Sequence, residues 1–312
     1  MKFMKKSALL LVYLTLLVTS CDKPTSANPA PAIELRTEGY MMVDGRNRSY
    51  LLNLPPNYNE SSDFSLVIAL HGGGGQASQM ESDYLLTEKA NTAKFAIVYP
   101  EGVQSDGFLG VRTWNAGTCC DYAIEKNIDD VKFISTLIDE LLKKYPKINP
   151  KKVYATGMSN GAMLCYRLAC ELSNKIAAIA PVAGTLATTQ ACQPLRPVPI
   201  LHIHSKLDKK VPYEGGKGIF GYYFPPVEDG LNTWLKNNAC NITSKKVTPF
   251  EKYTLSKWET CGHDSTIEFY FTNDGGHSWP GGLHNRLAAD EPSTALNAND
   301  LIWAFFQQYQ LP

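Results

Sequence analysis

A serine between two glycines is the most chemically suggestive feature of the sequence. It lies at the centre of residues 157–161 (GMSNG), which match the pattern Gly-x-Ser-x-Gly. The apolar run 153–156 precedes the motif and a helix-like segment, 162–169, follows it. A strand, this motif and a helix in that order are typical of a nucleophile elbow, a tight turn that needs glycines where side chains would collide. Because the motif also occurs by chance in glycine-rich chains, the prediction that Ser159 is a nucleophile depends on its neighbours.

A glycine-rich segment earlier in the chain supplies a second part of such a site. The apolar run 65–70 leads directly into His71 and the glycines 72–75. Glycines after a buried strand let the backbone turn sharply and point N–H groups at a ligand. We expect the N–H groups of Gly73 and Asn160 to form an oxyanion hole. The alternatives are a flexible loop or a phosphate loop, and the phosphate loop fails because no Gly-Lys-Ser/Thr follows.

An acid and a base follow two later strands. Asp208 comes just after the apolar run 199–204, and His277 lies in a glycine-rich loop after the strand-like segment 266–271. The chain order Ser159, Asp208, His277 is that of the α/β-hydrolases and differs from the orders in chymotrypsin-like and subtilisin-like proteases. We therefore predict a catalytic triad in which His277 is the general base and Asp208 orients its ring.

The other histidines are weaker candidates for the base. His71 begins the glycine loop and is expected to orient it. His202 and His204 are two apart on a predicted strand, so they share one face of it. A metal there would need a third ligand, which the nearby sequence does not offer, so we expect both to be packed and hydrogen-bonded. His263 and His284 lie in polar loops with no evident partner.

Four aromatic residues are candidates for substrate binding. They are Trp114, Trp279, Tyr222 and Tyr223, all in loops that follow predicted strands or are rich in glycine. Two interpretations of Trp114 remain open, because it can form a pocket wall or pack over the sheet. The aromatic loop 215–224 can likewise line a substrate groove or cover the core.

Strand-like and helix-like segments alternate along most of the chain. This pattern predicts an α/β fold with a mostly parallel central sheet and helices on both faces. The predicted strands are 33–43, 48–54, 65–70, 95–99, 153–156, 176–182, 199–204 and 266–271, the first two forming a hairpin. The predicted helices are 79–93, 129–145, 162–169, 227–238 and 293–310. In the second of these helices one apolar stripe is formed by Val131, Ile134, Leu137, Ile138 and Leu141. The acids at 129 and 130 are expected to cap this helix and not to act in catalysis.

Length and charge limit the classes of protein. The chain has 312 residues and a formal net charge of zero, with no basic stripe, so we expect no nucleic-acid partner. Residues 1–21 resemble a bacterial lipoprotein signal, with a basic start, an apolar run at 8–18 and a lipidated Cys21. That run is shorter than the about 20 residues that cross a bilayer. The alternative is an ordinary secretory signal in which the cysteine is coincidental.

The predicted domain organisation follows from this leader. Residues 22–32 form a polar, proline-rich tether, and 33–312 form a single catalytic domain. The exported protein would contact a membrane only through the lipid on Cys21.

Export favours disulfides over a metal site. Seven of the eight cysteines follow the leader, and none forms a C-x-x-C pair or a cluster with zinc spacing, so we predict no metal. We favour a disulfide between Cys240 and Cys261, and with less support one between Cys170 and Cys192. The odd number leaves a free thiol, for which Cys165 on the helix after Ser159 is the best candidate.

Several stretches together resemble one known family. They are 70–74 (LHGGG), 112–117 (RTWNAG) with Cys119 and Cys120, 157–161 (GMSNG), 178–184 (AIAPVAG), Asp208 with 211–213 (VPY), and 275–281 (GGHSWPG). These segments look like the secreted esterases grouped as polyhydroxybutyrate depolymerase-like and feruloyl or acetylxylan esterase-like hydrolases. The similarity extends from about Gly39 to the end of the chain.

The resemblance implies an α/β-hydrolase fold, no cofactor, and a triad of Ser159, Asp208 and His277. It implies a serine carboxylesterase acting on feruloyl or acetyl esters of plant polysaccharide fragments, or on oligomers of polyhydroxyalkanoate or a similar polyester. A non-catalytic binding lipoprotein on the same scaffold is an alternative from another class. A peptidase of this fold usually needs an additional lid or propeller domain, for which the chain has little room.

Three positions depart from the family pattern. Ser205 and Ala162 stand where members usually have glycine, and Asp121 follows the cysteine pair where glycine is common. None of these departures involves the triad, but Asp121 is expected to alter the pocket.

Overall fold

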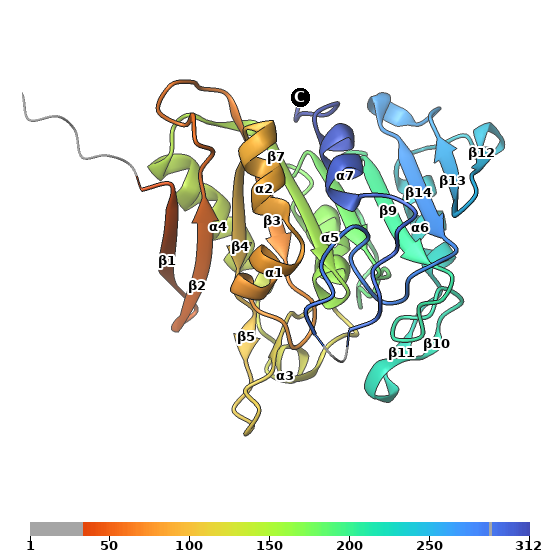
Figure 1. The fold of residues 1–312 in the computed structure, drawn as a ribbon, viewed down its shortest axis with the longest axis horizontal. Helices are drawn as coiled ribbons and strands as arrows, with labels where there is room; N and C mark the ends of the chain where they lie inside the picture. Colours follow the sequence, from red (N-terminus) through yellow and green to blue (C-terminus); the bar gives the residue numbers. More distant parts are fainter. Residues whose placement is uncertain (1–33, 287–288) are drawn as a thin grey trace, which may run out of the picture. The chain divides into compact units, whose positions relative to one another are not determined.

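The computed structural model of the chain describes residues 34–286 and 289–312. Residues 34–312 form one compact unit (Figure 1). The predicted leader, the predicted lipidation site Cys21 and the predicted tether lie outside the described residues. Within the described part of the chain, no helix is long and apolar enough to cross a membrane.

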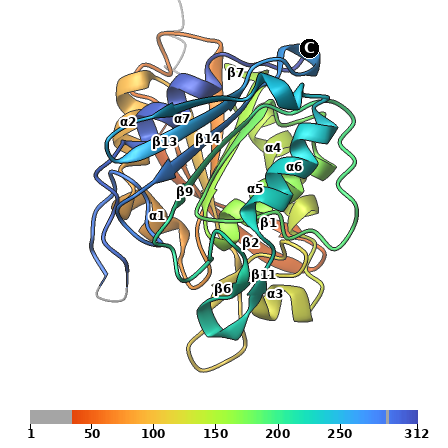
Figure 2. The same ribbon diagram turned by 90° about the vertical axis from the view of Figure 1, so that its right-hand side faces the viewer.

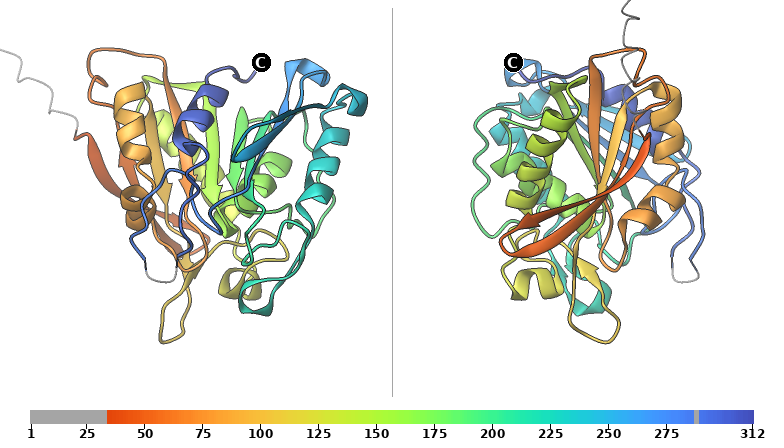
Figure 3. Two further views of the ribbon diagram at one scale, coloured as in Figure 1. Left: turned by 45° about the vertical axis from the view of Figure 1, so that its right-hand side comes forward. Right: turned by 90° about the vertical axis from the view of Figure 1, so that its left-hand side faces the viewer.

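A ten-stranded sheet forms the centre of this unit. Its strands are β1 (Arg36–Val43), β2 (Arg46–Asn53), β3 (Phe64–Leu70), β4 (Ala96–Pro100), β7 (Ile148–Met158), β8 (Ala178–Val182), β9 (Ile200–Ser205), β12 (Lys246–Pro249), β13 (Tyr253–Trp258) and β14 (Ile267–Thr272). Their spatial order is β1-β2-β4-β3-β7-β8-β9-β14-β13-β12. The predicted β1–β2 hairpin is confirmed and lies at one edge of the sheet (Figure 3).

The middle of the sheet is parallel and its two margins are antiparallel. From β4 across to β14 each strand is parallel to its neighbours within that span, whereas β2 pairs with β4, and β13 with β14, in the antiparallel sense. Every residue of β3, β8 and β9 is buried. Strands covered on both faces need continuous apolar runs, which explains why the sequence identified these strands.

Helices cover both faces of the sheet (Figure 2). They are α1 (Ala77–Asp83), α2 (Leu86–Ala93), α3 (Asp121–Glu125), α4 (Asp130–Lys144), α5 (Asn160–Glu171), α6 (Val227–Asn237) and α7 (Ala298–Phe306). α1, α2 and α7 contribute to one buried apolar cluster, and α4, α5 and α6 contribute to the other. The sheet therefore separates two hydrophobic cores.

Helix α4 shows how the sequence specifies such a layer. Its predicted apolar stripe is buried against the sheet: Val131, Ile134, Leu137, Ile138 and Leu141. Asp129 caps the helix, as predicted, by accepting a hydrogen bond from the Lys132 N–H. Asp130 has a further role, because its buried carboxylate pairs with Arg48 at 2.7 Å and also accepts the Asn115 N–H at 2.7 Å. This buried ion pair fixes the loop that begins at Asn115.

Two predicted helices are wrong in extent. The segment 79–93 forms α1 and α2 instead of one helix, because Leu85 between them adopts a left-handed conformation with φ of 56°. The segment 293–310 contains only α7, which begins after Asn297, whose side chain caps it by accepting the Asp300 N–H. Residues 293 and 294 instead bind the carboxylate of Asp274.

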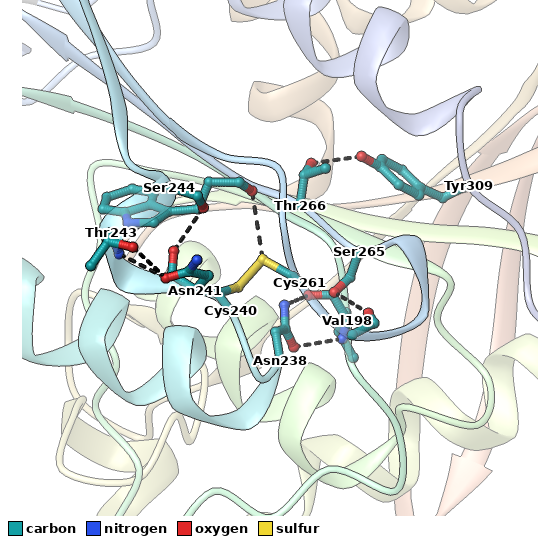
Figure 4. Close-up of a disulfide and its surroundings, with 12 residues drawn as sticks. Val198, Asn238, Cys240, Asn241, Thr243, Ser244, Cys261, Ser265, Thr266 and Tyr309 are labelled. Carbon is teal, nitrogen blue, oxygen red and sulfur yellow. Dashed lines mark hydrogen bonds between the residues drawn. A yellow bond between two sulfur atoms is a disulfide. The ribbon is translucent and has the colours of Figure 1, made fainter.

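The segment between Cys240 and Cys261 contains two strands that were not predicted from the sequence. It forms β12 and β13, which extend the sheet at its far edge. The predicted disulfide between Cys240 and Cys261 closes this segment, with the two Cα atoms 3.8 Å apart (Figure 4). Next to it, the Asn238 side chain makes paired hydrogen bonds with the backbone of Val198.

The second predicted disulfide, Cys170–Cys192, and the buried free thiol of Cys165 are also confirmed. The structure adds a disulfide between the adjacent Cys119 and Cys120, which the sequence analysis did not propose.

The loops beyond the carboxyl ends of the parallel strands gather at one end of the molecule. They include the short hairpin of β5 (Val103–Gln104) and β6 (Arg112–Thr113), helix α3, and the hairpin of β10 (Gly216–Lys217) and β11 (Tyr223–Phe224). All of them lie at the lower edge of Figure 1. Ligands of parallel α/β sheets bind at this end.

Candidate active site

The predicted nucleophile lies on a tight turn between β7 and α5. Ser159 has φ of 57° and ψ of −120°, an unfavourable conformation for a residue with a side chain. The turn is fixed by the backbone, since the Ser159 N–H donates to the Val182 carbonyl at 2.9 Å. A Cβ on Gly161 would collide with the carbonyl oxygens of Leu70 and His71. The motif therefore has the close-packed geometry of a nucleophile elbow.

The glycine loop lies directly against this turn. A Cβ on Gly72 would lie 3.4 Å from the Ser159 Cβ, and one on Gly73 would lie 3.7 Å from the Asn160 Cβ. Asn160 is the first residue of α5, so its N–H has no acceptor within the helix. Gly73 and Asn160 both line the same cleft as Ser159. The two predicted oxyanion donors thus stand on adjoining segments beside the serine.

His71 orients the glycine loop, in agreement with its predicted role. Its ring is fully buried, and its Nε2 accepts the Gly102 N–H at 2.9 Å. Nδ1 therefore carries the proton and donates to the Gly72 carbonyl at 2.8 Å. Burial lowers the pKa of His71 to about 4, so the ring is neutral at pH 7.

Trp114 does not have the predicted role of a substrate contact. Its side chain is fully buried, and it does not line the cleft. The indole Nε1 donates to the His71 carbonyl at 2.8 Å, and the Trp114 backbone makes two hydrogen bonds with the Asn160 side-chain amide. Trp114 thus joins the glycine loop to the start of α5. Of its two interpretations, a pocket wall or a packed residue, the structure supports the packed residue.

The predicted acid and base are in direct contact. His277 Nδ1 lies 2.7 Å from Asp208 Oδ2. The other carboxylate oxygen of Asp208 accepts the N–H groups of Lys210 and Val211, both at 2.9 Å. Burial acts to raise the pKa of Asp208, but the His277 ring and these hydrogen bonds outweigh it and hold the pKa below its usual value. Asp208 is therefore ionised at pH 7 and fixes the imidazole tautomer.

Ser159 and His277 face the same cleft, which has a volume of about 500 Å³. Among the described residues, no hydrogen bond joins the Ser159 hydroxyl to the His277 ring. In enzymes without substrate such contacts are often long and tighten only when the substrate binds.

The other predicted substrate contacts divide into two groups. Tyr222 and Trp279 line the cleft. The Trp279 ring stacks on Tyr84, and its Nε1 donates to Asn299 at 2.9 Å, so one face of the cleft is rigidly supported. Tyr223 does not line the cleft and is 72% exposed, because its strand β11 turns this side chain outward.

The two strand histidines form a buried hydrogen-bonded chain, as predicted. Tyr166 Oη lies 2.8 Å from His202 Nδ1, and His202 Nε2 lies 3.2 Å from His204 Nδ1. His204 Nε2 donates to the Val211 carbonyl at 2.9 Å. Burial lowers the pKa of both rings, so they are neutral. Within the part of the chain that the structure describes, no three His, Cys, Asp or Glu side chains form a metal-binding group.

Two further residues hold the loop of His277, and the sequence analysis missed their roles. The Asp290 carboxylate accepts the His277 N–H at 2.7 Å and pairs with Lys210 at 2.9 Å. The Ser205 hydroxyl lies 3.1 Å from the carbonyl oxygens of both Asp274 and Gly275. Ser205 had a detectable signal, because it departs from the family glycine, whereas no local pattern marked Asp290.

Comparison with known proteins finds similar sequences among esterases. The pattern of the phospholipase/carboxylesterase family matches residues 59–254. Feruloyl esterase B of Piromyces equi is 29% identical over 273 residues, covering 85% of this chain and 46% of that protein. A bifunctional acetylxylan esterase/xylanase of Neocallimastix patriciarum is 28% identical over 239 residues, covering 77% of this chain and 32% of that protein. The chain thus spans less than half the length of these two relatives.

Among solved structures, the acetyl xylan esterase from Aspergillus awamori superimposes with a TM-score of 0.60 at 15% identity. The match covers 87% of this chain and 99% of that chain. At this identity the likeness bears on the fold alone, and it confirms the predicted α/β-hydrolase fold.

Proposed function

Because the chain belongs to the phospholipase/carboxylesterase family, we propose that it is a serine esterase whose triad is Ser159, His277 and Asp208. The observation that carries the proposal is the Asp208–His277 pair, at 2.7 Å, facing the same cleft as the elbow serine. The intact set of nucleophile, base, acid and oxyanion donors argues against a non-catalytic binding protein on this scaffold.

The reaction proceeds through an acyl-enzyme. His277 Nε2 takes the proton of the Ser159 hydroxyl as the serine oxygen attacks the ester carbonyl carbon. The N–H groups of Gly73 and Asn160 bind the resulting oxyanion, and each such donor is typically worth about 3–4 kcal/mol of barrier. The imidazolium then protonates the leaving alcohol. Water repeats the attack on the acyl-enzyme, with the same ring as base, and releases the acid and Ser159.

We propose that the substrates are feruloyl or acetyl esters on fragments of plant polysaccharide. The names of the two relatives, a feruloyl esterase and an acetylxylan esterase, point to these substrates. The cleft also suits a flat aromatic acyl group, since Trp279, Tyr222 and Phe224 line it together with Met163.

A second candidate substrate is an oligomer of polyhydroxyalkanoate or a similar polyester. It is favoured by four strongly exposed apolar side chains on two loops beside the cleft: Phe108, Leu109, Phe220 and Tyr223. Exposed apolar groups of this kind suit contact with a water-insoluble surface. Hydrolysis rates on methyl ferulate, acetylated xylan and hydroxybutyrate oligomers would rank the two candidates.

We further propose that the protein is exported and is held at a bacterial membrane by lipid on Cys21. The disulfides at Cys170–Cys192 and Cys240–Cys261 support an oxidising location. Labelling with a radioactive fatty acid tests the anchor. Wild-type protein is expected to take up label and Cys21→Ser is not, and equal labelling would refute lipidation at this residue.

The activity is tested with Ser159→Ala. We expect this variant to lose hydrolysis of p-nitrophenyl acetate by at least about 10⁴-fold while its circular dichroism stays unchanged. A fluorophosphonate probe should label the wild-type protein and not the variant. Ser244→Ala, in an exposed turn, is the matched control and should keep both properties. Retained hydrolysis in Ser159→Ala would contradict the triad.

A further inference from the structure

A second hollow adjoins the active-site cleft and differs from it in chemistry. It has a volume of about 460 Å³ and shares part of its wall with the cleft, since both are lined by Gly74, Gly75, Gln79, Leu109, Val111 and Arg286. Small-molecule sites typically have volumes of about 300–1,000 Å³. We call it the polar hollow, and its polar side chains are Gln76, Gln79, Gln104, Arg112 and Arg286.

The amides of the polar hollow have unused hydrogen-bonding groups. Gln79 Nε2 donates to Asp83 at 2.8 Å, but its Oε1 is buried and has no partner. A buried polar atom without a partner, such as Gln79 Oε1, costs free energy and is usually explained by an ion, water or ligand. Gln76 and Gln104 are exposed, and among the described residues their side-chain amides make no hydrogen bond within the chain, so they are open to a ligand.

The charges of the polar hollow are balanced within the protein. Arg112 Nε lies 3.4 Å from the Glu101 carboxylate, and Arg286 Nε lies 3.4 Å from that of Asp83. A site for an anion would present positive charge in excess. This hollow instead offers amides and guanidinium groups whose charge is already compensated, which suits the hydroxyl groups of a neutral ligand.

We propose that the polar hollow binds the alcohol part of the ester, and that this part is a neutral sugar. The inference rests on the proposed esterase function. An ester held at Ser159 has an acyl side and an alcohol side, and two adjoining hollows of opposite polarity meet at the oxyanion loop. The acyl group lies among the apolar and aromatic side chains of the cleft, and the sugar hydroxyls bind Gln76, Gln79 and Gln104.

The first test compares two esters that share one acyl group. The measured quantity is the ratio of kcat/KM for feruloyl-arabinose to kcat/KM for methyl ferulate, which has no sugar. In Gln76→Ala/Gln104→Ala we expect this ratio to fall about tenfold, the effect of losing one to two hydrogen bonds. Gln190→Ala is the matched control, because Gln190 is an exposed glutamine outside both hollows. Because the readout is a ratio, a general loss of folded protein cancels. An unchanged ratio in the double variant would overturn the proposal.

The second test measures binding without catalysis. Ser159→Ala protein is titrated by calorimetry with arabinose-substituted xylo-oligosaccharides that carry no ester. We expect binding that Gln76→Ala/Gln104→Ala weakens about tenfold and Gln190→Ala does not change. Absence of binding to Ser159→Ala protein would overturn the proposal. Tighter binding of glucuronic acid-bearing oligosaccharides than of neutral ones would also overturn it, by showing an anion site.

The two tests separate this inference from the proposed function. If the wild-type protein hydrolyses no ester, the esterase proposal fails, and the calorimetric experiment still decides whether the polar hollow binds a neutral sugar. If the esters are hydrolysed but the glutamine variants leave the ratio unchanged, the esterase proposal stands and the sugar site fails.

Discussion

The nucleophile elbow and the base loop (residues 273–286 and 289–293) are held in place by different kinds of contact. The elbow is fixed by backbone hydrogen bonds and by glycines packed against neighbouring backbone. The base loop is fixed by side chains, because the carboxylates of Asp274 and Asp290 and the hydroxyl of Ser205 bind its backbone and its neighbours.

This difference explains why the elbow is easier to recognise in the sequence than the base loop, and why mutations affect the two regions differently. A turn made of backbone and glycine is a property of a few consecutive residues. A loop held by side chains depends on polar residues scattered along the loop itself and on Ser205 and Lys210 from another segment, and single polar substitutions change it in small steps.

The largest loss of activity is expected at the contact between the base loop and Asp208. We expect Asp208→Asn to lower kcat about 10⁴-fold, because an amide cannot accept from both backbone N–H groups and also hold the His277 tautomer. Steady-state hydrolysis of p-nitrophenyl acetate measures the loss. Asp139→Asn, on the exposed face of α4, is the matched control and should be neutral. A loss of less than tenfold in Asp208→Asn would mean that another carboxylate orients the base.

At the elbow the expected failure is one of folding. Gly161→Val forces a side chain against the carbonyl groups of Leu70 and His71, so we expect the free energy of unfolding to fall by about 4 kcal/mol. Urea denaturation followed by tryptophan fluorescence measures it. Gly107→Ala, at an open loop position, should change stability by less than about 0.5 kcal/mol. Equal stability of the two variants would mean that the elbow is not close-packed.

Acid pH should destabilise the glycine loop beside the elbow and the base loop over different pH ranges. The pKa of buried His71 is about 4, whereas an unfolded histidine has about 6.5. Between these values the unfolded chain binds a proton that the folded ring does not, so stability falls as pH drops from about 6.5 to about 4, by about 3 kcal/mol in total. The pKa of Asp208, Asp274 and Asp290 lies below the usual value. Their contributions are present above an aspartate's ordinary pKa of about 4 and are lost only as pH falls below it.

Denaturation from pH 7 to pH 3 tests this separation. His71→Gln should flatten the slope of unfolding free energy between pH 6.5 and pH 4, and Asp290→Asn should flatten it only below about pH 4. The same slope in His71→Gln as in the wild type would show that His71 does not contribute to the upper window.

The smallest effect on activity is expected at Asp290, which holds the base loop. Asp290→Asn removes the charge that pairs with Lys210 and weakens the contact with the His277 N–H, so we expect kcat to fall about tenfold with little change in KM. Asp264→Asn, in an exposed turn, is the matched control. A pure change in stability, with kcat per folded molecule unchanged, would assign Asp290 a structural role only.

Sequence patterns predicted the features that local residues specify. The elbow, the glycine loop, the buried central strands and the stripe of α4 follow from consecutive spacing, and all four are present. The break at Leu85 was missed because the apolar spacing continues across it, while its φ of 56° depends on how α1 and α2 pack. The two interpretations of Trp114 differed only in tertiary contacts, which no spacing encodes.

By itself the sequence predicted the types of the proposed catalytic groups, their order along the chain and the turn that carries Ser159, because these depend on short segments with their own steric requirements. Only the tertiary structure decided that Ser205, Lys210 and Asp290 hold the base loop, and that three glutamines share a hollow beside the cleft. These contacts form only once the sheet has brought the loops to one edge, so no local pattern marked Lys210, Asp290 or the glutamines, and Ser205 was marked only by its departure from the family glycine.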